Sequence, residues 1–375
     1  MFESKIFKDL LAIGTADIIG LVIVGIFWFY IAANISPAEF GEIQYFIGVA
    51  TISSSLSLIG GQNTITVFIA KNMKVEATFY FISLIVGGIC SLILWIIFMR
   101  VDASLLVFGL ILNVLIMGDL LGNKDFRKYT KFFLLQKIIM TTGGLATYFL
   151  FGSEFLIYSI FFSYLIFSYR IYESFRNSKI DFIVFKLKKG FIINNYLMMA
   201  ANGINTQIDR LIILPIFGYE LLGNYSLGQQ ILGLLTIIPG IVFKYLLPND
   251  STGIKNTRLR LITIIISVCL VITGVVVLPL LIPLFFKEYI MAIEVIQVAS
   301  LSILPITINT LYVSRFMGNE RSSITLFGGF IKLGVMTVAT VILGMFYGIV
   351  GIAYALVLAS VVECMFYYIS SKRNN

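Results

Sequence analysis

Ionisable side chains interrupt the apolar segments of this 375-residue sequence, at positions where lipid would be expected. The clearest case is "NTQIDRLIILPIFGYELLGNYSLGQQ" (205–230), in which Asp209 and Arg210 stand side by side. Charges within a membrane are costly, and they usually face a protein interior or a water-filled cavity. A guanidinium matches the oxygens of a phosphate. Arg210 is therefore a candidate for binding an anionic substrate, and the alternative is a structural charge that pairs with an acid on another helix.

Two lysines also lie within apolar segments. Lys332 stands near the middle of its segment, in "GGFIKLG", where the small residues leave room for a ligand or for close helix packing. Lys137 lies about six residues inside another segment, and its long side chain can also extend to the membrane surface. We interpret both lysines as candidate substrate-binding cations, with helix packing and surface contact as the alternatives.

Acidic residues supply possible partners for these cations. Asp17, within "IGTADIIG", and Asp209 are candidates for a counter-ion or for the binding of a coupling ion or proton. Packing between helices is the alternative for Asp17. Glu363 is better explained as a structural partner of a base, and Asp119 as a residue at the membrane interface.

Uncharged polar residues gather in the same segments and could line a cavity of the size of a sugar. Each of them could equally hydrogen-bond a neighbouring helix. The candidates for the cavity wall are Gln62, Asn63, Asn202, Asn205 and Gln229.

The composition places these residues in an integral membrane protein. Hydrophobic residues make up 59% of the chain and charged residues only 12%, whereas about a quarter of a soluble protein is charged. There is no histidine, and the three cysteines lie within apolar runs. We therefore expect no metal site, no cofactor and no histidine-based catalysis. A membrane-embedded glycosyltransferase or polymerase would need catalytic carboxylates and a sizeable polar loop, so we expect no enzymatic activity.

The apolar segments predict an all-α membrane protein with twelve transmembrane helices, since about 20 apolar residues cross the hydrocarbon core. The predicted spans are 11–34, 43–69, 78–99, 103–122, 132–151, 154–171, 191–218, 224–247, 260–285, 290–314, 323–346 and 349–369.

The distribution of basic residues predicts the orientation. Of the 27 lysines and arginines, 22 fall at the termini, in the loops or at the span ends on one side of this arrangement, two in loops on the other side, and three deeper within spans. Basic residues accumulate on the cytoplasmic side. Both termini of this multi-pass protein are therefore expected in the cytoplasm, at the cell membrane. The net charge of +8 follows from this topology and implies no nucleic-acid partner.

A weak internal repeat predicts two six-helix halves around a central cavity. Gly41 and Gly223 each follow an acidic residue and open a span, while Gly152 and Gly348 each follow an aromatic residue and precede a tyrosine by six positions. Parallel halves with a substrate path between them are a transporter architecture. The halves would be 1–171 and 191–375, joined by the basic cytoplasmic linker 172–190.

Three stretches resemble a known family, the polysaccharide-type (Wzx-like) flippases of the multidrug/oligosaccharidyl-lipid/polysaccharide exporter superfamily. They are "ISPAEFGEIQYFIGVAT" (35–51), "IDRLIILPIFGYELLGNYSLGQQILGLLTIIPGIVFKYLLP" (208–248) and "SRFMGNERSSITLFGGFIKLGVMTVATVILGMFYGIVGIAYALVLASVVE" (314–363). The similarity extends along the chain and is strongest in its second half.

The resemblance implies a function. Such a flippase moves a lipid-linked oligosaccharide, of polyprenyl pyrophosphate type, from the inner to the outer leaflet by alternating access, for the biosynthesis of surface polysaccharide or O-antigen. Its partners would be this substrate, membrane lipid and a coupling ion or proton. The alternative is a cation-coupled multidrug antiporter of the same superfamily.

Overall fold

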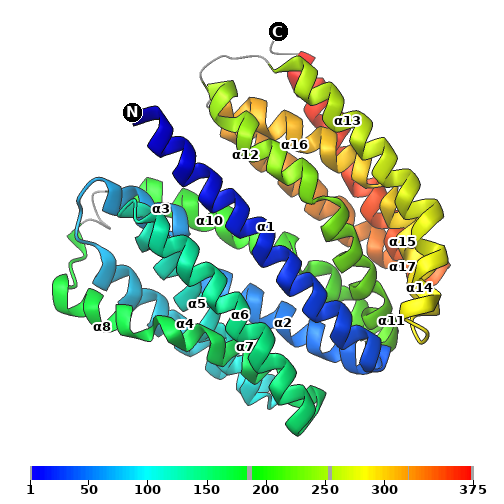
Figure 1. Cartoon of the computed structure of the whole chain (residues 1–375), viewed down its shortest axis with the longest axis horizontal. Coiled ribbons are helices and arrows are strands. Elements are labelled where there is room, and N and C mark those ends of the chain that lie inside the picture. The colour runs from blue at the N-terminus through cyan, green and yellow to red at the C-terminus, as the bar shows by residue number, and fades with distance from the viewer. Residues whose placement is uncertain (1, 184–187, 252–255, 320, 373–375) are drawn as a thin grey trace. The chain divides into compact units, whose positions relative to one another are not determined.

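Long apolar helices dominate the structure, a computed structural model that describes residues 2–183, 188–251, 256–319 and 321–372 (Figure 1). Within these described residues, eight helices could cross a membrane by length and composition, or ten if each of two bent pairs is one span. Two of the eight contain a glycine with non-helical backbone angles, Gly218 and Gly348. Division there yields twelve spans, and the described residues contain no strand. The predicted all-α membrane fold is confirmed.

The first six spans are continuous helices apart from the second and the sixth. Their helices are α1 (Phe2–Asn34), α2 (Pro37–Ser57), α3 (Gly61–Ala70), α4 (Glu76–Phe98), α5 (Val101–Gly122), α6 (Phe126–Phe151), and, for the sixth span, η1 (Ser153–Phe155), α7 (Leu156–Tyr164), η2 (Leu165–Phe167) and α8 (Ser168–Asn177). The last of these, α8, extends into the predicted linker 172–190, of which residues 184–187 lie outside the described part of the chain.

The remaining six spans contain more breaks. Their helices are α10 (Lys189–Asn205), α11 (Ile208–Leu235), α12 (Ile237–Ser251), α13 (Thr257–Ile272), η3 (Thr273–Val277), α14 (Leu278–Phe285), α15 (Ile290–Ser300), α16 (Ile303–Gly318) and α17 (Ser322–Lys372).

Several spans are broken where the sequence predicts a continuous helix. Helices α2 and α3 meet at 43°, and α15 and α16 at 45°. At the first bend, Gly60 and Gly61 have φ angles of 86° and 68°, in the left-handed region that only glycine enters readily. The seventh span is interrupted between α10 and α11. A break in a membrane helix leaves backbone polar groups without helical partners. Such breaks are tolerated only where these groups are buried in protein or line a cavity.

The chain forms two compact units, which we describe separately. Unit 1 comprises Met1–Trp28 and Tyr45–Gln207, and unit 2 comprises Phe29–Gln44 and Ile208–Asn375. Helix α10 belongs to unit 1 because it packs on the second span, where Gly61 meets Met199 and Gly203 meets Ser55. The proposed halves, 1–171 and 191–375, remain a prediction.

The fourth span forms the centre of unit 1. Helix α5 packs against α3, α4, α6 and α7 (Figure 1), and its side chains are far more buried than those of its neighbours. Unit 2 repeats this plan, since its fourth span, α15 with α16, packs against α11, α12, α13, α14 and α17. Each unit thus places its fourth span at the centre of its own helices.

The repeated glycines have matching roles in the two units. Gly152 separates the fifth and sixth spans with φ 90°, and Gly348 separates the eleventh and twelfth with φ 59°. Both angles lie in the left-handed region, which costs glycine little. The chain therefore reverses at equivalent points through the same kind of residue.

The other glycine pair forms a close contact within unit 2. A Cβ on Gly41 would collide with the carbonyl oxygen of Tyr219, and a Cβ on Gly223 would collide with the carbonyl oxygen of Pro37. The contact is reciprocal, because each glycine lies against the residue four positions before the other. The first turn of α2 and the second segment of α11 therefore approach backbone to backbone.

We expect Gly223→Ala to lower the thermal stability of the purified protein, because the added methyl group must push α2 and α11 apart. The cost should be about 1–3 kcal/mol, as for other overpacked sites. Gly233→Ala is the matched control on the same helix, since nothing lies within 4 Å of its added Cβ. Melting in detergent would measure both, and equal melting temperatures would contradict the close contact.

Candidate functional site

Asp209 lies in the first turn of α11 with both carboxylate oxygens engaged. Its Oδ1 accepts a hydrogen bond of 2.8 Å from the backbone N–H of Arg210, and its Oδ2 accepts one of 2.7 Å from the hydroxyl of Tyr225. Gln229 Nε2 donates to the same hydroxyl at 2.8 Å. Tyr225 is fully buried. These bonds tie the beginning of α11 to its segment beyond Gly218.

Arg210 uses its guanidinium differently. Its Nη1 donates a hydrogen bond of 3.0 Å to the backbone oxygen of Gln44, near the beginning of α2. The side chain is half-buried, and among the described residues it makes no ion pair within 4.0 Å. A guanidinium carries five N–H donors, so most of its capacity is available. Arg210 can hold α2 against α11 and still bind an anion.

Lys332 has an acidic neighbour on the same long helix, beyond the turn at Gly348. Its Nζ lies 3.5 Å from Glu363 Oε2. Asn309 Nδ2 donates to the same oxygen at 2.8 Å, and Tyr367 donates to Glu363 Oε1 at 3.2 Å. The pairing expected for Glu363 is present, whereas a role of Lys332 in substrate binding remains a prediction.

Unit 1 brings Lys137 and Asp17 into one neighbourhood between α1 and α6. Gly20, one turn beyond Asp17, packs against Phe133 and the stem of Lys137. The Lys137 ammonium stands 5.4 Å from the centre of the Phe133 ring, an arrangement that favours the cation. Asp17 lies close enough to Tyr129, one turn before Phe133, to act on it electrostatically.

The other candidate polar residues divide between the two units. In unit 1, Gln62 packs against Gly118 of α5, and Asn63 beside it is exposed. Asn202 is exposed and Asn205 half-buried on α10, which packs against α3. Gln229 belongs to unit 2, where it holds Tyr225.

One buried polar contact was missed by sequence reasoning. Gln136 is almost fully buried and donates a hydrogen bond of 2.9 Å to Ser163, joining the fifth and sixth spans. Gln136 precedes Lys332 by 196 positions, the same offset that separates Gly152 from Gly348. Lys332 likewise joins the eleventh span to the twelfth through Glu363. The repeat offset was the signal that could have identified Gln136.

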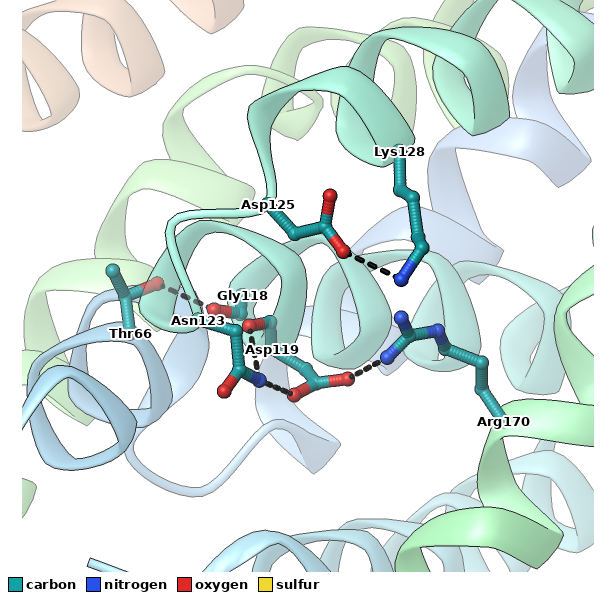
Figure 2. Close-up of polar contacts among 7 residues, drawn as sticks. All are labelled: Thr66, Gly118, Asp119, Asn123, Asp125, Lys128 and Arg170. Carbon is teal, nitrogen blue, oxygen red and sulfur yellow. Dashed lines mark hydrogen bonds and ion pairs between the residues drawn. The ribbon is translucent and has the colours of Figure 1, made fainter. Parts of the chain in front are cut away.

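Asp119 is the centre of a network at the end of α5, shown in Figure 2. Arg170 Nη1 lies 2.8 Å from its Oδ2, and Asn123 Nδ2 donates to its Oδ1 at 2.6 Å. Nearby, Lys128 stands 2.7 Å from Asp125, and its hydrogen bond lowers the pKa of that carboxyl. Asp119 is buried, and its ion pair with Arg170 joins the end of α5 to α8.

A similar ion pair lies at the end of α12 in unit 2. Arg260 Nη2 lies 2.6 Å from Asp250 Oδ2, and Ser314 donates to the same oxygen at 2.6 Å. Arg260 Nη1 also donates to the backbone oxygen of Leu311 at 2.8 Å. These contacts bind the eighth, ninth and tenth spans together. Among the described residues, no group of three potential metal ligands occurs.

Comparisons with solved structures reveal the class of this fold. A lipid II flippase MurJ in an inward closed conformation superimposes with a TM-score of 0.81 at 13% identity, over 96% of this chain and 87% of that one. An inward-facing multidrug resistance MATE transporter of the MOP superfamily gives 0.68 at 14%, over 94% of each chain. The chain shares its fold with these two structures.

A third structure has the same fold and a different pocket. It is a MOP-superfamily transporter from Pyrococcus furiosus, whose binding pocket has a reversed polarity that suggests a different function. Its TM-score is 0.61 at 14% identity, over 98% of this chain and 95% of that one. No family profile and no curated protein sequence match this chain. The predicted fold of a multi-pass membrane protein is confirmed by this likeness, whereas transport and its subtype remain predictions.

Replacing Arg170 by methionine is expected to destabilise the protein, because it leaves Asp119 buried without its cation. Breaking a buried pair in this way costs about 3–5 kcal/mol. Lys128→Met in the exposed pair with Asp125 is the control and should cost below about 1 kcal/mol. Unfolding in mixed detergent micelles would measure both variants, and a smaller loss for Arg170→Met than for Lys128→Met would refute the structural role.

Proposed function

We propose that this protein flips a lipid-linked oligosaccharide, carried on a polyprenyl pyrophosphate, from the inner to the outer leaflet. The observation that carries the proposal is that two basic side chains within the spans keep hydrogen-bond donors for a ligand. Among the described residues, the Arg210 side chain makes one hydrogen bond, to a backbone oxygen, and the Lys137 ammonium lies beside an aromatic ring. Both retain donors for the oxygens of a phosphate, the group that a pyrophosphate-linked headgroup presents.

The acids within the same spans are already engaged. Asp209 accepts two hydrogen bonds, and Glu363 has Asn309, Tyr367 and Lys332 around it. A site for an anionic headgroup needs available cations rather than available acids. The substrate-binding set is therefore Arg210, Lys332 and Lys137, with Asp17 and Asp209 as counter-ions or ion-coupling groups, and with Gln62, Asn63, Asn202, Asn205 and Gln229 toward the sugar.

The same proposal includes the membrane and the mode of action. The protein acts in the cell membrane with both termini in the cytoplasm, because this orientation satisfies the positive-inside rule along the chain. Two six-helix halves, 1–171 and 191–375, alternate access around the substrate, and surface polysaccharide or O-antigen synthesis uses the product. The likeness to a lipid II flippase, with a TM-score of 0.81, supports this choice of substrate class.

A cation-coupled multidrug antiporter is the second candidate. The likeness to multidrug resistance MATE transporters, with TM-scores of 0.68 and 0.64, favours it. Such a protein would bind cationic substrates through an acidic side chain, for which Asp17 is the candidate.

Arg210→Ala and Lys332→Ala should each reduce flipping at least about tenfold, the loss of roughly 1.4 kcal/mol of binding, while the protein still inserts. The assay is transfer of a pyrophosphate-linked sugar across reconstituted vesicles, detected by a sugar-modifying enzyme outside. Arg258→Ala removes an exposed charge and should leave the rate unchanged. Native rates in both span variants would rule out the cationic site.

Deletion of the gene distinguishes the two candidate functions in cells. A flippase predicts that an intact lipid-linked oligosaccharide accumulates with its headgroup on the cytoplasmic side, and that restoring the gene reverses this. An antiporter predicts no accumulation and greater sensitivity to cationic drugs. Mass spectrometry of the lipid extract, with headgroup accessibility in intact spheroplasts, separates these results.

A further inference from the structure

The ion pair of Lys332 and Glu363 is asymmetric. Glu363 is held by two neutral donors, Asn309 Nδ2 at 2.8 Å and the Tyr367 hydroxyl at 3.2 Å, both closer than the Lys332 ammonium at 3.5 Å. Asn309 is itself fixed, because its Nδ2 also donates to the backbone oxygen of Ser360 at 3.0 Å. The carboxylate would therefore stay in place if the ammonium left.

The two side chains of the ion pair also differ in burial. The side chain of Glu363 is 10% exposed, whereas that of Lys332 is 32% exposed. A lysine side chain is a flexible stem with a compact charge and rotates readily. The ion pair is consequently the contact in this cluster that is easiest to exchange.

An apolar groove lies along α17 within one helical turn of Lys332 in the sequence. It has a volume of about 470 Å³ and is lined by Gly334, Val335, Val338, Ala339, Ile342, Leu343 and Leu358. Val335 lies one helical turn from Lys332 and thus on the same face of α17. A molecule with an anionic head and an apolar chain matches this combination of a cation and an adjoining apolar groove.

We propose that Glu363 is the resident counter-ion of Lys332, and that a phosphate of the incoming lipid-linked substrate displaces it while the prenyl chain occupies the groove. This inference rests on the proposed function and adds Glu363 to it as a positioning residue. The ammonium must leave the carboxylate before it meets the phosphate, so Glu363 weakens substrate binding. The carboxylate reclaims the ammonium when the substrate departs, which promotes release.

The test is binding of farnesyl pyrophosphate to the purified full-length protein in detergent, measured by calorimetry. Glu363→Gln keeps the shape and an acceptor for Asn309 but removes the competing charge. It should tighten binding about two- to fivefold, the factor expected for one partly exposed ion pair. A merely structural defect would weaken binding, so the sign of the change separates the two explanations.

Three further variants complete the design. Glu294→Gln changes the net charge equally at an exposed site and should leave the affinity unchanged. Lys332→Met should weaken binding, and the double variant Lys332→Met/Glu363→Gln should bind like Lys332→Met alone, because Glu363 acts only through Lys332. Tightening in the double variant, or none in Glu363→Gln, would overturn the inference.

The inference and the proposed function can fail separately. If Arg210→Ala abolishes flipping while the Lys332 and Glu363 variants bind farnesyl pyrophosphate like the native protein, the counter-ion exchange is wrong and the flippase remains. If the native protein neither binds this probe nor flips a pyrophosphate-linked sugar, both are wrong. Inorganic pyrophosphate should bind more weakly than the prenylated probe, and equal affinity would refute the use of the groove.

Discussion

The cost of a charge in an apolar environment is the constraint on which this structure depends. Asp119, Asp209, Asp250 and Glu363 lie in or at the ends of apolar helices, and each accepts hydrogen bonds from at least two donors. At least one donor to each acid comes from another helix or from beyond a break in the same helix. Each buried acid therefore joins segments that are distant along the chain, and it helps to define how they pack.

The bases within the spans follow a different pattern. Arg210 contacts a backbone oxygen, Lys137 an aromatic ring, and Lys332 a carboxylate that other residues already hold. An acid whose oxygens are engaged cannot readily take another cation, whereas a base with unused donors can bind an anion. This asymmetry is the physical reason for preferring an anionic substrate over the cationic drugs of an antiporter, within a fold that serves both kinds of transport.

Glycine provides the second constraint. The left-handed angles of Gly152 and Gly348 reverse the chain between paired spans, and Gly41 and Gly223 allow two helices to approach at their backbones. These four residues form the two pairs that the sequence repeat identified, so the repeat preserves backbone geometry where side chains have diverged. The central position of the fourth span in each unit shows the same conserved plan at the level of packing.

The sequence by itself determined the fold class and the approximate limits of the twelve spans, because crossing a membrane requires about 20 apolar residues and a helix to satisfy the backbone. It also identified which residues were costly enough to need an explanation. Only the tertiary structure decided their partners. The bond from Tyr225 to Asp209 spans 16 positions and the one from Arg210 to Gln44 spans 166, distances at which helical periodicity carries no information. The breaks at Gly60–Gly61 and between α10 and α11 were likewise invisible, since hydropathy records how apolar a segment is and not where its backbone turns.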